Sequence, residues 1–227
     1  MADNFEDLYI KLRDKESRVL SLDEVKLLPE TKSTNPNKNE WFLRKRTAER
    51  FSKYLRKNKV NSLLEIGCGN GWFTNYCNHS VEHVVGIDIN QTELNQAKQA
   101  FPNIDFYYWD IFTEPPFDNK FDLVVLNAVI QYFPDFEITI NRLKDFLNTK
   151  GEIHILDSPF YAKEEIAAAK KRTFKYYTKM SVPEMAEHYY HNSLDAVNDF
   201  ETLYKPNRIK QLFKGEDSPF CWYRLRP

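Results

Sequence analysis

Cysteine is scarce in this 227-residue chain, and the three that occur, Cys68, Cys77 and Cys221, form no C-x-x-C pair. An odd number with this spacing indicates neither a disulfide framework nor a structural zinc site. No apolar run reaches the roughly 18 residues that cross a bilayer. Residues 1–20 mix acids with bases and lack the apolar stretch of a signal peptide. We therefore expect a cytoplasmic protein with no membrane segment and no metal site.

An excess of charge of one sign is also absent, because 32 lysines and arginines oppose 33 aspartates and glutamates, for a net charge of -1. This balance supplies no general attraction to nucleic acid or to an anionic membrane surface. One segment departs from it: residues 38–59 hold nine basic side chains against Glu40 and Glu49, a local charge of +7. Such a face can steer an acidic substrate or RNA, although a solvated helix surface is its commoner explanation.

Five apolar runs of strand length stand between residues 62 and 156, with helical patterns between them. The runs are 62–66, 84–89, 104–109, 121–129 and 152–156. Strands that alternate with helices form βαβ units, because parallel neighbours need a crossover connection. The sequence therefore predicts a doubly wound α/β fold with a parallel sheet covered on both faces.

Segments on either side of these runs complete the predicted fold. A helix over 41–57 places Ala48, Phe51 and Leu55 on one face, which we expect to pack beside the first strand. Helical stretches at about 160–200, including 163–178, form an insert. The C-terminal segments 199–206 and 218–227 have strand-like composition. We expect them to be antiparallel sixth and seventh strands, joined through a helix at about 207–213.

Glycines and polar residues follow the first four apolar runs, at the edge where open α/β sheets bind ligands. Residues 65–71 read Glu-Ile-Gly-Cys-Gly-Asn-Gly, and these glycines let the backbone turn sharply and approach a ligand. Asp88, Asp110 and Asn127 stand at or near the ends of the next three runs. The nicotinamide or flavin fingerprint G-x-G-x-x-G does not fit, because Trp72 occupies its third glycine position, and no G-K-S/T follows to make a P-loop.

Five segments in order resemble the motifs of class I methyltransferases that use S-adenosylmethionine. LLEIGCGNGWFT resembles the first motif, E/D-x-G-x-G-x-G, and VVGIDIN is similar to the second-strand motif. FYYWDIF, FDLVVLNAVIQYFPD and LKDFLNTKGEIHILD match the three segments that follow. The resemblance covers about residues 61–157, and an ordered set of five is far more specific than one glycine loop.

This resemblance implies a mostly parallel seven-stranded sheet with helices on both faces and an antiparallel C-terminal strand. It also implies two parts: an N-terminal helical extension or cap over residues 1–60, and a Rossmann-like methyltransferase domain over 61–227 that carries the insert.

The resemblance implies S-adenosylmethionine as the cofactor and nine binding residues. These are Glu65, Gly67, Cys68, Gly69, Asp88, Ile89, Asp110, Ile111 and Asn127. Asp88 would hold the ribose, Ile89 would pack on adenine, and Asp110 with Ile111 would line the adenine edge. Asn127 would lie beside the methionyl part. Glu65 either contacts the cofactor or orients the glycine loop.

The implied reaction is transfer of a methyl group to a small-molecule nucleophile, through oxygen or nitrogen and including a carboxylate. Gln131 and Tyr132 follow the fourth strand and are the candidates for facing the substrate, but neither is a ready base at neutral pH. Many small-molecule members carry a histidine there, and this chain does not, which favours an already ionised nucleophile or catalysis by orientation. Two alternatives remain: methylation of RNA or protein, and a non-catalytic S-adenosylmethionine-binding partner protein.

Two further groups are candidates for closing the site. Trp41 and Arg44 open the first helix of the main fold and would close over the cofactor. Tyr189, Tyr190 and His191 would form a lid or a substrate wall, although ordinary packing of an amphipathic insert is the slightly commoner explanation for each of them taken singly.

Overall fold

The computed structural model describes residues 2–207 and 217–227, apart from the side chains of residues 2–4. Its α-helices are α1 (Ala2–Lys15), α2 (Leu22–Leu27), α3 (Lys38–Asn58), α4 (Trp72–Asn78), α5 (Gln91–Ala100), α6 (Phe136–Lys144) and α7 (Ile166–Lys179). Its strands are β1 (Ser62–Ile66), β2 (His83–Asp88), β3 (Asp105–Tyr108), β4 (Phe121–Asn127), β5 (Leu147–Leu156), β6 (Glu201–Tyr204) and β7 (Trp222–Leu225). Short 3-10 helices are η1 (Ile130–Tyr132), η2 (Lys163–Glu165), η3 (Pro183–His188) and η4 (Leu194–Val197).

The strands form one seven-stranded sheet in the order β3-β2-β1-β4-β5-β7-β6. Neighbours from β3 to β5 are parallel, and β7 pairs antiparallel with both β5 and β6. The predicted sheet with an antiparallel C-terminal strand is therefore confirmed. The expected antiparallel pairing of the sixth strand is also confirmed, because β6 pairs antiparallel with β7. The helix expected at about 207–213 lies outside the described residues except for Asn207.

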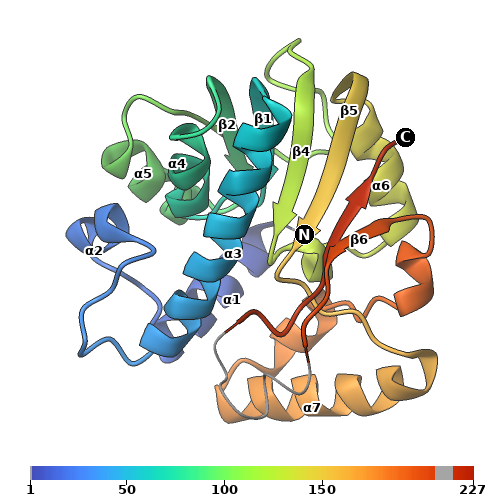
Figure 1. Cartoon of the computed structure of the whole chain (residues 1–227). Coiled ribbons are helices and arrows are strands. Elements are labelled where there is room, and N and C mark those ends of the chain that lie inside the picture. The colour runs from blue at the N-terminus through green and yellow to red at the C-terminus, as the bar shows by residue number, and fades with distance from the viewer. Residues whose placement is uncertain (1, 208–216) are drawn as a thin grey trace.

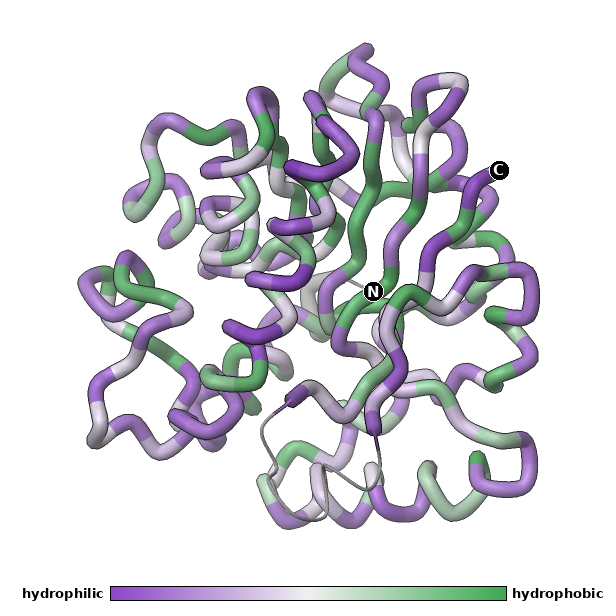
Figure 2. Tube along the Cα trace, in the orientation of Figure 1, coloured by the Kyte–Doolittle hydropathy of each residue, from purple (hydrophilic) through white to green (hydrophobic). Residues whose placement is uncertain are grey.

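The central strands are buried on both faces because alternate residues point to opposite sides. In β4, Leu123 and Val125 belong to the hydrophobic cluster that also contains residues of α3, α4 and α5, whereas Val124 and Leu126 belong to the cluster with α6. All four side chains are fully buried, and Figure 2 shows β4 as hydrophobic along most of its length. This two-sided core confirms the doubly wound fold.

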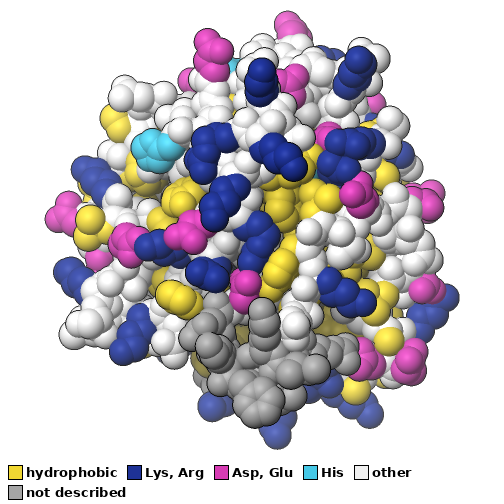
Figure 3. Space-filling view, in the orientation of Figure 1, with side chains coloured by type: hydrophobic (Ala, Val, Ile, Leu, Met, Phe, Trp, Pro, Cys, Tyr) yellow, Lys and Arg dark blue, Asp and Glu magenta, His cyan; other side chains and the backbone are white. Residues whose placement is uncertain are grey.

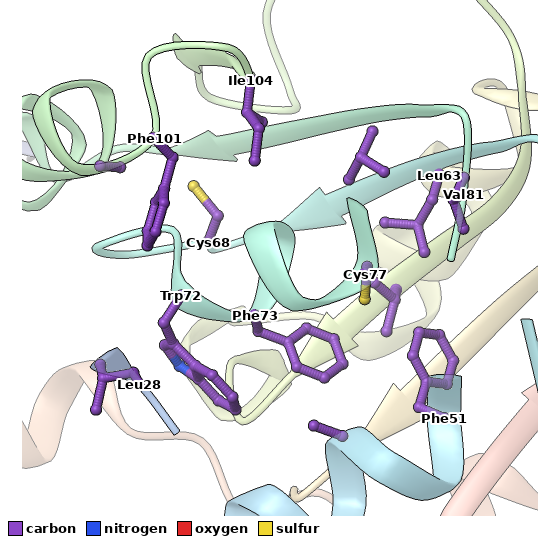
Figure 4. Packing of buried hydrophobic residues seen from close by; sticks show 14 of the residues in the cluster. Leu28, Phe51, Leu63, Cys68, Trp72, Phe73, Cys77, Val81, Phe101 and Ile104 are labelled. Atoms are coloured by element: carbon purple, nitrogen blue, oxygen red, sulfur yellow. The ribbon is translucent and has the colours of Figure 1, made fainter. Parts of the chain in front are cut away.

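Helix α3 lies across one face of the sheet (Figure 1). Ala48, Phe51 and Leu55 are fully buried in the same cluster as Leu63 of β1, as the helical spacing predicts. The rings of Phe51 and Phe73 stack 5.6 Å apart, which joins α3 to α4 (Figure 4). The N-terminal segment therefore shares the core of the sheet.

Most basic residues of α3 occupy its outer face, where Lys and Arg side chains gather (Figure 3). Arg46, Lys53 and Lys57 are exposed, whereas Arg50 pairs with Asp217 at 2.7 Å. This amphipathic distribution agrees with a solvated helix face.

Helix α1 and the insert after β5 meet beyond the carboxyl ends of the strands. A separate hydrophobic cluster joins them through Leu12 of α1, Tyr177 of α7 and Met185 of η3, all buried. In Figure 1 the arrowhead of β4 points toward the end of the molecule that holds α1 and α7. The two elements together form a lid over that edge of the sheet.

Candidate active site

A cavity of about 1010 Å³ opens at the carboxyl ends of β1, β2 and β4. This edge is the switch point of the sheet, since the chain runs from β1 out to β3 and then returns to place β4 on the other side of β1. All nine predicted cofactor residues line the cavity, and so do Gln131 and Tyr132. The structure therefore brings the predicted site residues together.

The glycine loop between β1 and α4 needs glycine for both conformation and space. Gly67, Gly69 and Gly71 have positive φ angles of 69°, 53° and 76°, which side chains other than glycine rarely adopt. A Cβ on Gly67 would lie 2.3 Å from Cγ2 of Val129. Cys68 donates its N–H to the carbonyl of Ile87 at 2.9 Å, which ties the loop to β2.

Glu65 lies behind this loop, 2% exposed, and accepts a hydrogen bond from the Thr74 hydroxyl of α4. Burial raises the pKa of the Glu65 carboxyl to about 8. This contact fixes α4 against β1, so the geometry favours the loop-orienting role over direct contact.

Asp88 is held at the end of β2 by two backbone groups. Gly69 donates its N–H to Oδ2 at 2.7 Å, and Asn90 donates its N–H to Oδ1 at 2.8 Å. Burial, with repulsion from Glu93, raises the pKa of Asp88 to about 7. The carboxylate is therefore fixed beside the glycine loop, with one further lone pair on each oxygen to accept from a ligand hydroxyl.

Asn90 begins α5 as its N-cap and accepts the Glu93 N–H at 2.9 Å. Its own N–H bonds to Asp88, and the Glu93 carboxylate turns toward the cavity, with Oε2 2.7 Å from where a Cβ on Gly69 would stand. Glu93 thus lies directly over the glycine loop.

Asp110 and Ile111 follow β3 and form another part of the wall. Asp110 is exposed, and its Oδ1 accepts the Phe112 N–H at 3.0 Å, a turn contact that leaves its second oxygen facing solvent or a ligand. Ile111 is buried, and its carbonyl accepts Nε of Arg142 at 2.6 Å. Arg142 of α6 therefore holds this part of the wall in place.

Residues after β4 are fixed by backbone contacts. The carbonyl of Ala128, a residue with a φ of 58°, accepts Nε2 of Gln131 at 2.6 Å, and the carbonyl of Gln131 accepts the Tyr190 N–H at 2.7 Å. Oδ1 of Asn127 is buried without a hydrogen-bond partner in the described part of the chain. Gln131 braces the wall, whereas Asn127 offers a free acceptor to the cavity.

Tyr132 belongs to an aromatic wall built from three separate segments. Its ring lies 5.7 Å from that of Phe5 and 5.8 Å from those of Tyr9 and Tyr189. Tyr189 and Tyr190 line the cavity as expected. No sequence pattern predicted the α1 side of this wall.

The insert also carries a histidine that the motif comparison missed. His188 lines the cavity and contacts Phe5 edge-on at 5.4 Å. His191 instead packs behind Tyr189 at 5.1 Å and hydrogen-bonds the Thr173 hydroxyl at 2.8 Å. No histidine directly follows β4 along the chain, but folding brings His188 from a distant segment into the cavity, whereas His191, a candidate for the wall, does not line it.

Helix α3 contributes two side chains to the cavity near the glycine loop. Trp41 packs edge-on against Trp72 at 5.3 Å, and the Arg44 guanidinium lies 5.2 Å over the Trp41 ring. Nε of Arg44 donates to Glu40 at 2.9 Å. Both predicted closing residues, Trp41 and Arg44, line the cavity.

Other sequence features lie apart from the cavity. His154 is fully buried in the core, where Nε1 of Trp222 donates to its Nδ1 at 2.8 Å. Within residues 2–207 and 217–227, no helix has the length and apolar character to cross a membrane. The same residues contain no group of three or more His, Cys, Asp or Glu side chains able to hold a metal ion.

The chain is similar in sequence to known methyltransferases. A family model described as "Methyltransferase domain" matches residues 57–215, well over half of the chain. A putative methyltransferase of Invertebrate iridescent virus 6 is 29% identical over 112 residues, covering 48% of this chain and 42% of the relative. A malonyl-acyl-carrier-protein O-methyltransferase of Halalkalibacterium halodurans is 30% identical over 103 residues, covering 42% and 38%. The chain therefore spans about two fifths of the length of these relatives.

Solved structures share the fold at lower identity. The plantazolicin methyltransferase BpumL, in complex with a pentazolic desmethylPZN analog and SAH, has a TM-score of 0.56 at 17% identity, covering 99% of this chain and 97% of that one. The YcgJ protein from Bacillus subtilis also has a TM-score of 0.56, at 16% identity and with 71% of each chain covered.

Proposed function

The chain belongs to the methyltransferase domain family, and from this premise we propose that it is an S-adenosylmethionine-dependent methyltransferase acting on a small-molecule nucleophile. The observation that carries the proposal is the carboxylate of Asp88, fixed by the N–H groups of Gly69 and Asn90 beside the glycine loop. A carboxylate in this place is suited to accept both hydroxyl hydrogens of a ribose.

Buried polar atoms without partners support the cofactor assignment. Among the described residues, Oδ1 of Asn127, Nδ2 of Asn90 and Nε1 of Trp109 are buried and lack a hydrogen bond, and all three residues line the cavity. Leaving such groups unpaired is costly. Asn127 offers an acceptor to the cofactor's ammonium group, whereas Asn90 and Trp109 offer donors near the ribose and adenine ends.

Charge supports the same assignment. Asp88, Glu93 and Asp110 line the cofactor half of the cavity, and an acidic wall favours a ligand with a sulfonium and an ammonium group. When bound, the cofactor supplies a methyl group activated by its sulfonium. The chain's part is to orient the acceptor and to exclude water, which the aromatic wall under the lid is placed to do.

The acceptor is proposed to be small because the cavity lies under the lid of α1 and η3. Its volume of about 1010 Å³ reaches the upper end of the ~300–1,000 Å³ typical of pockets for a single ligand. Relatives named for carboxylate-bearing substrates, such as a trans-aconitate 2-methyltransferase of Rhizobium rhizogenes, support an acid. A hydroxyl or an amine could also be the methyl-accepting group, because the imidazole of His188 lies on the wall and can take up the proton that such a group must lose.

The alternatives receive less support. The exposed basic residues of α3, such as Arg46 and Lys53, do not line the cavity. An RNA or protein bound to these residues would therefore not be positioned at the cavity. A non-catalytic partner protein has no need of a closed acceptor compartment. We further propose that residues 1–60 act as a cap on a domain formed by 61–227, and that the protein is cytoplasmic, since its three cysteines are free thiols.

Calorimetric titration with S-adenosylmethionine, S-adenosylhomocysteine and NADH tests the proposal. We expect saturable binding of the first two and none of NADH. A following assay supplies methyl-labelled S-adenosylmethionine and a small-molecule extract. Tight binding without label transfer favours the non-catalytic alternative, and binding of NADH alone overturns the proposed function.

A further inference from the structure

The side chain of Arg13 in α1 is largely buried, and few hydrogen-bond acceptors lie near its guanidinium group. Its side chain is 14% exposed and lines the cavity. Its nearest carboxylates are Glu93, 3.9 Å from Nε, and Glu16, 4.0 Å from Nη1. In the part of the chain that the structure describes, these contacts include no hydrogen bond, and Nε is buried without a partner.

Glu16 does not require Arg13 as its counter-ion. Nε of Arg18 lies 3.2 Å from Glu16, and the hydroxyl of Tyr176 donates to the same side chain. Arg18 and Arg44 in turn pair with Glu40. The acids of the lid are therefore satisfied by other groups, and Arg13 keeps its donors for something else.

A guanidinium presents five N–H donors in a planar fork. Burying a donor such as Nε without an acceptor is costly, because it loses the water that would otherwise bind it. The ligand that best matches the fork is a carboxylate, which accepts two parallel hydrogen bonds. The state of Arg13 thus points to an anionic ligand in the cavity.

The surroundings place Arg13 on the acceptor side of the cavity. Its guanidinium lies 5.6 Å from the centre of the Tyr9 ring, and Tyr9 contacts Tyr132 at 5.8 Å. The groups suited to the methionyl part of the cofactor, Asn127 among them, come from the strand ends rather than from α1.

Charge is divided between the two halves of the cavity. The lid half carries Arg13 of α1, Arg18 directly after it and Arg172 of α7, with one acid, Glu16. Among the described residues Arg172 forms no ion pair. A positive lid facing an acidic cofactor half favours an acceptor of negative charge.

We propose that Arg13 binds the carboxylate of the methyl acceptor, so that the acceptor is a carboxylic acid with a flat or aromatic body suited to the rings of the lid. This inference rests on the proposed function, because it assigns the acceptor half of the same cavity. The same fork would suit the carboxylate of the cofactor, and the experiment separates the two sources.

The test uses the full chain saturated with S-adenosylhomocysteine and three matched probe pairs: benzoate and benzamide, cinnamate and cinnamamide, phenylacetate and phenylacetamide. Calorimetry should show at least one acid binding about 10- to 100-fold more tightly than its amide. Arg13→Gln should abolish that preference, and Arg13→Lys should keep part of it, because the charge remains while the fork is lost. Arg46→Gln, an exposed arginine outside the cavity, is the matched control and should change nothing.

A second arm compares S-adenosylhomocysteine with 5′-methylthioadenosine, which lacks the amino acid part. The acceptor assignment predicts that Arg13→Gln binds both nucleosides as the wild type does. A tenfold loss for S-adenosylhomocysteine alone would assign Arg13 to the cofactor and overturn the proposal. So would the absence of any acid preference in the wild type, or its survival in Arg13→Gln. Failure of the wild type to bind S-adenosylhomocysteine would instead overturn the proposed function itself.

Discussion

Replacing Asp88 by Asn is the most direct perturbation of the cofactor site. The carboxylate oxygens already accept the N–H groups of Gly69 at 2.7 Å and Asn90 at 2.8 Å, so the side chain needs no rearrangement to receive a ribose. A hydrogen bond to a charged group contributes about 1.5–3 kcal/mol. Asparagine loses the charge and one of the two acceptors. We expect binding of S-adenosylhomocysteine to weaken by about 3 kcal/mol, roughly a 100-fold rise in Kd.

The same carboxyl predicts a pH dependence of binding. Burial, followed by repulsion from Glu93, raises the pKa of Asp88 to about 7. Hydroxyl donors favour the ionised form, so affinity is full above this pKa and is lost as the pH falls through it. About nine tenths of the sites are protonated one unit below the pKa, so Kd should rise about tenfold from about pH 8 to about pH 6.

Isothermal titration calorimetry of wild type and Asp88→Asn at both pH values is the assay. Glu65 and Glu93, whose pKa values burial also raises, remain in the variant, so the difference between the two proteins isolates Asp88. Thermal denaturation verifies that the variant is folded. Equal affinity of the two proteins at about pH 8 would refute the ribose assignment, and a constant Kd in the wild type would refute the pH argument.

Three further substitutions test the surroundings of the site. Gly67→Ala should destabilise the protein by about 1–3 kcal/mol, because the residue has a φ of 69° and its Cβ would stand 2.3 Å from Val129; an unchanged midpoint of urea denaturation contradicts this. Arg142→Ala should weaken binding of S-adenosylhomocysteine about three- to tenfold, because it frees the carbonyl of Ile111; equal calorimetric Kd values exclude that role. Tyr132→Ala should lower the Tm by a few degrees, about 2–4 °C per kcal/mol lost, since its ring joins α1 to η1 and the insert. Tyr132→Phe keeps the ring contacts and serves as the control, and an equal loss in both variants would show that packing is not the cause.

The fold and the cofactor half of the site could be predicted because their signals are local. The apolar run of β4 and the glycines at 67–71 each depend on neighbours in sequence, and parallel strands necessarily bring their carboxyl ends to one edge. Asp88 could be placed from its spacing and from the family pattern, and the structure puts its carboxylate beside Gly69. The antiparallel setting of β7 followed from the family pattern and is confirmed.

The position of the Glu93 side chain and the neighbour of β6 in the sheet could not be predicted, because they depend on contacts between residues far apart in the sequence. The spacing of Asn90 and Glu93 suggests a helix cap, and Asn90 does cap α5. The Glu93 carboxylate nevertheless leaves the cap and lies over Gly69, opposite Arg13. Strand-like composition says nothing about which neighbour a strand pairs with, so only the structure placed β6 beyond β7 at the edge of the sheet.

By itself the sequence determined the doubly wound sheet, the glycine loop, and the acids at the ends of β2 and β3. Only the tertiary structure decided the acceptor half, where Phe5 and Arg13 of α1 meet Tyr132 and His188. An amphipathic helix shows that one of its faces will be buried, but its periodicity does not say against what. That choice is made by side-chain packing between segments far apart in the chain, and here it brings two peripheral helical segments together as one wall of the cavity.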